Sequence, residues 1–258
     1  MKPVPDPGFA WWLGTLGLAG ALLLVVGDQC LYFAPVSGAQ FQSRVLEIAA
    51  KAPTARALFG AGLAPIAVLL YLAGFTHVYL HTRQRHPRLA ALIWIGLALC
   101  ILAGGAYHVL WGAKVLVLKA AGASAAPAAG AMALYGALHR FAAGVYSIAE
   151  FTGYPAILLL ALVIASGPSG YPRWFCLLVP AVPMLVLQTI TPWIPAPFGS
   201  LAGGSAVNLS FALFFAVSLA VTRMRTHRPK ALDPDAVPPA QVRSQPARPA
   251  RSGGCRGC

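Results

Sequence analysis

The sequence predicts an all-α fold: a polytopic membrane helix bundle of six transmembrane helices, followed by a basic tail. The first observation is composition, since 58% of the 258 residues are hydrophobic, only 10% are charged, and the mean hydropathy is +0.70. A soluble domain carries roughly 25% charged residues, so this chain has too few to cover a surface in water. The second observation is that six stretches approach the roughly 20 apolar residues that a helix needs to cross a bilayer.

The predicted crossings follow one another along most of the chain. In order, they cover residues 9–33, 57–80, 89–112, 148–166, 174–190 and 205–221. The segment before the fourth, 131–149, is apolar but contains His139 and Arg140. We expect it to be a helical extension or an interfacial helix, because residues 131–166 are too few for two crossings and a turn.

Basic residues predict the orientation, because short basic loops stay in the cytoplasm. Arginines follow the second and fourth crossings and fill the tail, whereas the link 191–204 has no charge. We therefore expect a multi-pass protein of the cell membrane with both termini cytoplasmic. Three basic residues in the first outer loop oppose this, and Glu47 offsets them only in part: Arg44, Lys51 and Arg56.

The chain divides into a six-helix transmembrane domain, residues 1–225, and a cytoplasmic tail, residues 226–258. The tail is rich in Pro, Ala, Arg and Ser and has no apolar periodicity, which predicts disorder. Its basic charge suits the anionic inner leaflet. Despite a net charge of +13, the composition excludes a DNA-binding domain, a soluble enzyme and a disordered scaffold. The expected partner is membrane lipid, with no nucleic acid and no specific protein partner.

Five polar residues fall at similar depth in five of the six predicted helices. At about 1.5 Å per residue from the cytoplasmic end, Asp28 and His108 lie about 28 Å up their helices. Glu150 lies at about 24 Å, and Gln188 and Asn208 at about 22 Å. Ionisable residues within membrane helices are rare and face the bundle interior. We therefore predict a binding site formed by these five residues in the outer part of the hydrocarbon layer.

Helical phase gives independent support for Asp28. The residues that precede it at steps of three and four are Leu24, Ala21, Gly17 and Gly14. A stripe with small residues such as the last three is typical of close helix packing in membranes. Taken singly, Asp28 could also cap a helix end, and His108 could be a hydrogen-bonded core histidine. His77 and His81 have the i, i+4 spacing of helical metal pairs, but beside Arg83 they are expected to form an interfacial polar girdle.

Four segments also carry a resemblance to a known family. They are residues 27–32 (Gly-Asp-Gln-Cys-Leu-Tyr), 106–112 (Ala-Tyr-His-Val-Leu-Trp-Gly), 195–199 (Pro-Ala-Pro-Phe-Gly) and 208–211 (Asn-Leu-Ser-Phe). In these the chain resembles a family of uncharacterised bacterial six-helix integral membrane proteins, over most of its length except the tail. The resemblance implies a location in a bacterial inner membrane but no activity.

A weaker similarity is to the alkaline-ceramidase-like membrane hydrolases, which use Asp and several His residues around zinc. This chain has Asp28 and His108 but no second histidine at that depth. The similarity therefore leaves the metal, and any other cofactor, unassigned.

The converging polar groups predict an intramembrane pocket near the extracytoplasmic face that binds a lipid headgroup or a small amphiphile. One alternative is a membrane-embedded lipid hydrolase. In it Asp28, His108 and Glu150 bind a metal, or His108 and Glu150 act as base and acid. A further alternative is a proton-coupled transporter in which Glu150 and His108 exchange protons, although no internal repeat is visible. A purely structural role for these residues also stays open, and the sequence leaves enzymatic activity undecided.

Overall fold

The computed structural model describes residues 6–84, 86–123, 128–167 and 169–226. Within these ranges the chain is helical, as predicted, and the β-structure described there is one isolated bridge between Val36 and Phe198. The helix that ends the described chain reaches Thr226, so the predicted disordered tail lies outside the described residues.

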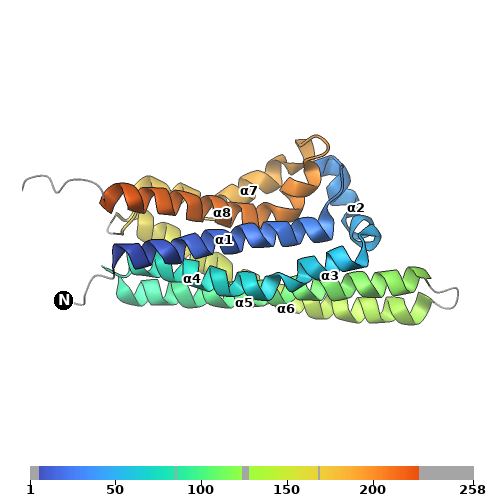
Figure 1. The fold of residues 1–258 in the computed structure, drawn as a ribbon. Coiled ribbons are helices and arrows are strands. Elements are labelled where there is room, and N and C mark those ends of the chain that lie inside the picture. The colour runs from blue at the N-terminus through green and yellow to red at the C-terminus, as the bar shows by residue number, and fades with distance from the viewer. Residues whose placement is uncertain (1–5, 85, 124–127, 168, 227–258) are drawn as a thin grey trace, which may run out of the picture. The chain divides into compact units, whose positions relative to one another are not determined.

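The described part of the chain has eight α-helices and two 3₁₀ helices. In order they are α1 Pro7–Tyr32, α2 Gly38–Lys51, α3 Thr54–Gly62, α4 Ala64–Thr82, α5 Pro87–Ala123, α6 Ala128–Ala165, η1 Arg173–Leu178, α7 Ala181–Ile190, η2 Thr191–Trp193 and α8 Gly199–Thr226. The longest helices run side by side: α1 packs between α4 and α8, and α5 packs along α6 (Figure 1).

Five helical segments of the described chain are long and apolar enough to cross a membrane, which indicates a multi-pass membrane protein. They are Gly8–Tyr32, Thr54–Thr82, Pro87–Gly122, Gly130–Ala165 and Gly199–Met224. Large apolar side chains are exposed on their outer faces, as lipid contact requires, among them Leu69, Leu92, Phe151 and Leu158.

The predicted crossing 174–190 is not a continuous helix, so the expected count of six is not confirmed. It consists of η1, an interruption at Val179 and Pro180, and the ten residues of α7. Val179 is extended, with ψ of 144°, because the ring of Pro180 disfavours the helical conformation in the residue before it.

Other boundaries also differ from those predicted. The second crossing is divided at Leu63 into α3 and α4, and Pro65 takes the first turn of α4, where a missing N–H is tolerated. The segment 131–149 is part of α6, which continues through Pro155, so the helical extension is the correct alternative. Because α5 and α6 are longer than predicted, this pair extends beyond α3 (Figure 1).

The small-residue stripe of α1 packs as predicted. A Cβ on Gly17 would lie 2.5 Å from the Cα of Gly74, so α1 and α4 nearly touch there. Ala21 and Leu24, further along the stripe, are buried. The same face of α1 leads to Asp28, whose side chain therefore points into the bundle.

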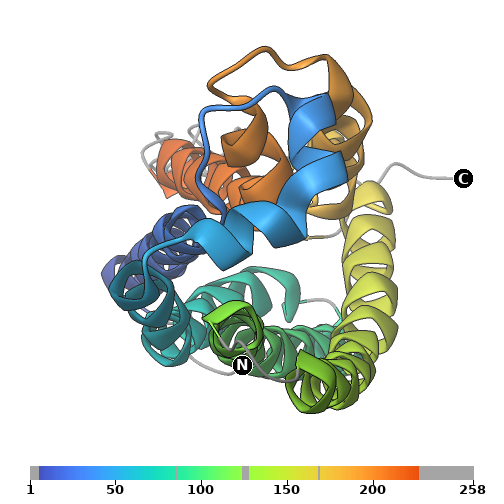
Figure 2. The same cartoon turned by 90° about the vertical axis from the view of Figure 1, so that its right-hand side faces the viewer.

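Helix α2 is held at one end of the bundle by its neighbours in space. Ser37 begins it with a capping box, in which its hydroxyl accepts from the Gln40 N–H and the Gln40 side chain accepts from the Ser37 N–H. The Gly38 N–H donates to the Ile194 carbonyl at 2.9 Å, and the Gly199 N–H donates to the Val36 carbonyl at 3.1 Å. Figure 2 shows α2 and the segment before α8 together at this end.

Candidate functional site

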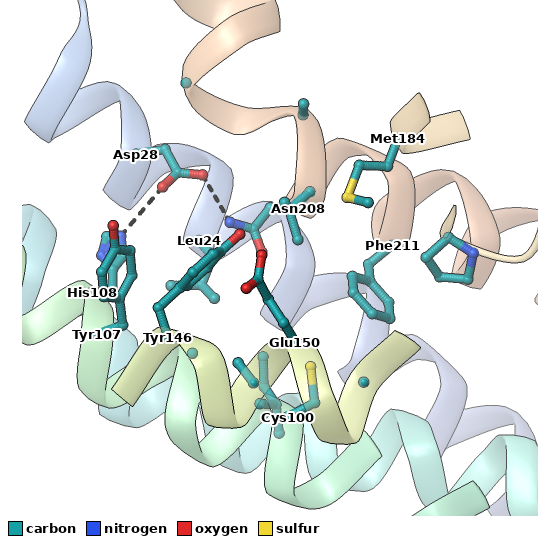
Figure 3. A pocket seen from close by; sticks show the side chains of 18 of the residues that line it. Leu24, Asp28, Cys100, Tyr107, His108, Tyr146, Glu150, Met184, Asn208 and Phe211 are labelled. Carbon is teal, nitrogen blue, oxygen red and sulfur yellow. Dashed lines mark hydrogen bonds and ion pairs between the residues drawn. The ribbon is translucent and has the colours of Figure 1, made fainter. Parts of the chain in front are cut away.

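All five polar residues predicted from depth line one cavity of about 430 Å³. Each comes from a different helix: Asp28 from α1, His108 from α5, Glu150 from α6, Gln188 from α7 and Asn208 from α8. The volume falls within the range of small-molecule sites, roughly 300–1,000 Å³. Figure 3 shows four of the five around the cavity.

Asp28 ends a hydrogen-bonded chain of side chains that has Asn208 at its centre. The Asn208 amide donates to Asp28 Oδ2 at 2.7 Å, and the Tyr71 hydroxyl donates to Asn208 Oδ1 at 2.8 Å (Figure 3 shows the first bond). Asp28 is only 7% exposed and Tyr71 is fully buried. The chain therefore joins α1, α8 and α4 and fixes the orientation of both Asp28 and Asn208.

His108 lies beside Asp28 without completing a hydrogen bond. Its Nε2 is 3.4 Å from Asp28 Oδ1, and neither ring nitrogen has a hydrogen-bond partner among the residues described. Because the side chain lines the cavity and its residue is 7% exposed, the alternative of a hydrogen-bonded core histidine is wrong. Both nitrogens are buried, and Nε2 lies near Gly27 of α1, so the ring stands at the cavity wall without a hydrogen bond to any described residue.

Gly27 in α1 and Gly60 in α3 allow α1 to lie close to α3 and to the His108 ring. A Cβ on Gly27 would lie 3.2 Å from the His108 ring and 3.1 Å from the carbonyl oxygen of Gly60 in α3. Any larger residue at position 27 would push α3 or the His108 ring away. The spacing between Asp28 and His108 therefore depends on Gly27.

Glu150 and Gln188 contribute without internal partners. Glu150 is half-buried, and its carboxyl points from α6 toward the side of the cavity where Asn208 lies (Figure 3). No hydrogen bond or ion pair joins Glu150 to another described residue. Gln188 is exposed although it lines the cavity, which places it at the margin.

Some residues near the site were missed by the sequence argument. Tyr71 looks like a core aromatic, and only the fold reveals the partner of its hydroxyl. Gln29, next to Asp28, donates to the Ser205 hydroxyl at 2.6 Å, while its own Oε1 is buried without a hydrogen-bond partner in the described chain. Eight aromatic residues also line the cavity and carried no signal by depth, among them Tyr32, Tyr107, Trp111 and Tyr146.

His77 contradicts the predicted interfacial girdle. It is fully buried, its Nδ1 is 2.7 Å from the Ala10 carbonyl, and its Nε2 is 2.9 Å from the Ser218 hydroxyl. The expectation failed because these partners lie on α1 and α8, far away in the sequence. The described residues include no group of three or more His, Cys, Asp and Glu placed to hold a metal ion.

Residues 12–224 match a protein family described as a family of unknown function, DUF6796. Neither the curated proteins nor the solved structures give a significant match. No relative's name therefore supports the expected similarity to alkaline-ceramidase-like hydrolases or a bacterial origin. The matched range includes all five residues of the predicted site.

Proposed function

The chain belongs to this family of unknown function, and from its own residues we propose that it binds a lipid headgroup or a small amphiphile in the cavity. One observation carries the proposal: polar residues from five helices converge on one cavity inside an apolar bundle. Polar and ionisable groups inside a membrane are costly, and functional sites are where they persist.

The lining of the cavity favours an amphiphile over a fully polar solute. Its polar residues are joined by apolar ones on the same wall, including Leu24, Phe75, Ile101, Ile157 and Phe211. A ligand with a polar head and an apolar chain satisfies both parts, because each part meets groups of its own kind. Helix α2 contributes Phe41 and Val45 and covers one end of the ligand.

We further propose six crossings, with η1 and α7 together forming the fifth as a broken helix. At about 2.0 Å per residue for η1 and about 1.5 Å for α7, the pair reaches about 27 Å, close to the roughly 30 Å of a bilayer core. An even number of crossings puts the starts of α1 and the end of α8 on one side, in keeping with their position in Figure 1.

The basic residues after the second and fourth crossings support a cytoplasmic location for that side, in a bacterial inner membrane. Reporter domains fused after Arg83 and after Ile194 test this arrangement. We expect cytoplasmic activity from the first fusion and extracytoplasmic activity from the second. The same side for both fusions would contradict the fifth crossing.

The binding function is tested by filling the cavity. Gly104 lines it, and nothing lies within 4 Å of a Cβ added there, so Gly104→Leu places a side chain in the cavity without a clash at Cβ. Gly144, on α6, also has open space but lies outside the cavity lining, so Gly144→Leu is the matched control. Both changes replace a helical glycine and gain similar helix propensity, up to about 1 kcal/mol.

We expect lipid or another amphiphile to co-purify in mild detergent with wild type and Gly144→Leu, and to be lost from Gly104→Leu. Mass spectrometry of organic extracts measures it, and size exclusion confirms that each variant is folded. Equal amounts of bound amphiphile in all three proteins would contradict binding in the cavity.

A second candidate function is lipid hydrolysis, which one contact favours. Asp28 Oδ1 lies 3.4 Å from His108 Nε2, so a carboxyl and an imidazole, two groups used in acid–base catalysis, lie side by side at the cavity. Incubating the purified protein with phospholipid vesicles and measuring released fatty acid distinguishes hydrolysis from binding. Release by wild type that is abolished in His108→Ala would establish it.

A further inference from the structure

The aromatic side of the cavity consists of four rings in close succession. The ring centroids of Tyr146 and Tyr107 are 4.6 Å apart, those of Tyr107 and Trp111 are 6.3 Å apart, and those of Trp111 and Tyr32 are 5.3 Å apart. The last two pairs are nearly perpendicular, at 89° and 83°, whereas the Tyr146 and Tyr107 rings are tilted by 39° and lie against each other. Rings at right angles form adjacent walls, and each ring face carries negative electrostatic potential.

The cavity wall contains acidic side chains, Asp28 and Glu150, but no basic side chain stronger than histidine among the residues described. Asp28 has Asn208 and His108 beside it, whereas the Glu150 carboxyl has no partner in the described chain. Glu150 is half-buried in an apolar bundle, where a counter-charge stabilises a carboxylate. The place for a positive charge is therefore beside Glu150.

Glu150 and the aromatic walls are next to each other. Tyr146 precedes Glu150 by one helical turn on α6, and Figure 3 shows both side chains pointing into the cavity from the same helix. A cation beside the carboxyl of Glu150 would thus be near the Tyr146 ring, against which the Tyr107 ring packs. Such carboxylate and aromatic surroundings are those that bind organic ammonium groups.

The protein already places one ammonium on this aromatic cluster. Lys114 Nζ lies 3.7 Å from the ring centroid of Trp111, within cation–π distance. Lys114 itself does not line the cavity. Since Trp111 is engaged by Lys114, the tyrosine faces are the ones that a ligand can use.

Other headgroup chemistries fit the same wall less well. A phosphate or carboxylate headgroup is bound by arginine, lysine or clustered N–H donors, and the described lining has neither of those basic side chains. A bare metal ion needs three or more ligands, and the described residues contain no such group.

We infer that the ligand of this cavity is an amphiphile whose head carries an organic ammonium group, bound by Glu150 and the rings of Tyr107 and Tyr146. The inference rests on the proposed function and narrows it to one ligand class. His108, whose ring nitrogens lack hydrogen-bond partners in the described chain, completes the polar side. The ammonium belongs either to a membrane lipid headgroup or to a free organic cation.

Four probes test the inference on the full-length protein in maltoside micelles. Decyltrimethylammonium, decanol and decyl sulfate share one alkyl chain and differ in head charge, and tetramethylammonium carries the charge without the chain. Calorimetric titration gives each dissociation constant. We expect decyltrimethylammonium to bind at least about 10-fold more tightly than decanol or decyl sulfate, as a desolvated cation–π contact implies.

Glu150→Gln removes the charge and keeps the shape of the side chain. We expect it to abolish the preference for decyltrimethylammonium over decanol. Glu47→Gln, the same substitution on the exposed face of α2, is the matched control and is expected to keep the preference. Tyr107→Phe retains a ring and is expected to bind decyltrimethylammonium, whereas Tyr107→Leu is expected to lose most of the affinity.

The outcomes separate the two proposals. If decanol binds wild type as tightly as decyltrimethylammonium, the cavity binds amphiphiles and the ammonium inference is wrong. If tetramethylammonium binds as tightly as decyltrimethylammonium, the ammonium inference stands, its source is a free cation, and lipid binding is wrong. If no probe binds, both proposals are wrong. This comparison needs wild type alone, so a misfolded variant does not obscure it.

Discussion

His77 and His108 are both buried histidines on apolar helices, but the structure surrounds them in opposite ways. His77 is fully buried, and both of its ring nitrogens are hydrogen-bonded. His108 lines a cavity, and neither of its nitrogens is hydrogen-bonded within the described chain. One ring holds helices together, and the other faces an open volume.

The geometry around His77 determines which atoms donate. The Ala10 carbonyl can only accept, so Nδ1 carries the proton and donates. In a neutral ring Nε2 then accepts from the Ser218 hydroxyl, which in turn accepts from the Tyr171 hydroxyl at 2.9 Å. Every group in this chain is satisfied by the protein itself. It joins α4, α1, α8 and the segment after α6.

The contrast shows which buried polar groups indicate function. Residue type and burial are similar for His77 and His108, and a polar group within an apolar bundle needs a polar partner. What differs is whether the protein supplies that partner. Asp28 and Asn208 are intermediate, because they bond to each other and to Tyr71 while still lining the cavity.

The largest expected effect separates the two histidines by stability. His77→Ala leaves the Ala10 carbonyl and the Ser218 hydroxyl buried without a partner, and it opens a void. We expect a loss of about 3 kcal/mol of unfolding free energy. His108→Ala breaks no hydrogen bond between described residues and should lose less than about 1 kcal/mol. Denaturant unfolding in detergent, followed by circular dichroism, measures both free energies. Equal losses for the two variants would contradict the distinction between a hydrogen-bonded and an unbonded histidine.

The two tyrosines that end the two chains allow a finer comparison. Tyr171→Phe and Tyr71→Phe each delete one buried hydroxyl, and each should cost about 1 kcal/mol of unfolding free energy. Only Tyr71→Phe should also weaken ligand binding, because it frees Asn208 Oδ1 to turn away from its present position at the cavity. Tyr79→Phe is the control, since the described residues offer its hydroxyl no hydrogen bond. Equal affinities for Tyr71→Phe and Tyr171→Phe would contradict the link to the site.

A smaller effect is expected at the contact between α1 and His108. Gly27→Ala adds a methyl 3.1 Å from the Gly60 carbonyl oxygen and 3.2 Å from the His108 ring, so α3 or the ring must shift by a few tenths of an ångström. We expect a change of less than about 1 kcal/mol in stability and a several-fold loss of ligand affinity. Gly144→Ala, which has open space, should leave affinity unchanged and serves as the control. Wild-type affinity in Gly27→Ala would show that the position of His108 is unimportant.

The sequence predicted the lining of the cavity better than it predicted the connections within it. Asp28, His108, Glu150, Gln188 and Asn208 were found because a helix has a fixed rise, so polar residues in apolar segments can be placed by depth. The partners of His77 could not be found in this way. They are Ser218, 141 residues away, and a backbone carbonyl that carries no sequence signal.

The helix boundaries failed for a related reason. Hydropathy averages over a window and detects apolar segments, but it does not detect a break at Leu63 or at Pro180. Both breaks lie close to a proline, which was visible in the sequence. Pro155 shows why that signal alone is insufficient, because α6 continues through it.

The smallest expected effect concerns a charged cluster outside both buried chains. Glu47 on α2 accepts from Arg44 at 2.8 Å and from Lys51 at 2.6 Å, and these hydrogen bonds lower the pKa of its carboxyl from 4.5 to about 2. A lowered pKa stabilises the fold above pH 4.5, and this contribution is lost as the pH falls toward 2. All three side chains are exposed, so solvent screens the effect. We therefore expect Glu47→Gln to match the wild-type Tm within error at pH 7 and pH 5. A clear drop in the Tm of Glu47→Gln at pH 7 would show that this exposed cluster stabilises the bundle as the buried hydrogen-bonded chains do.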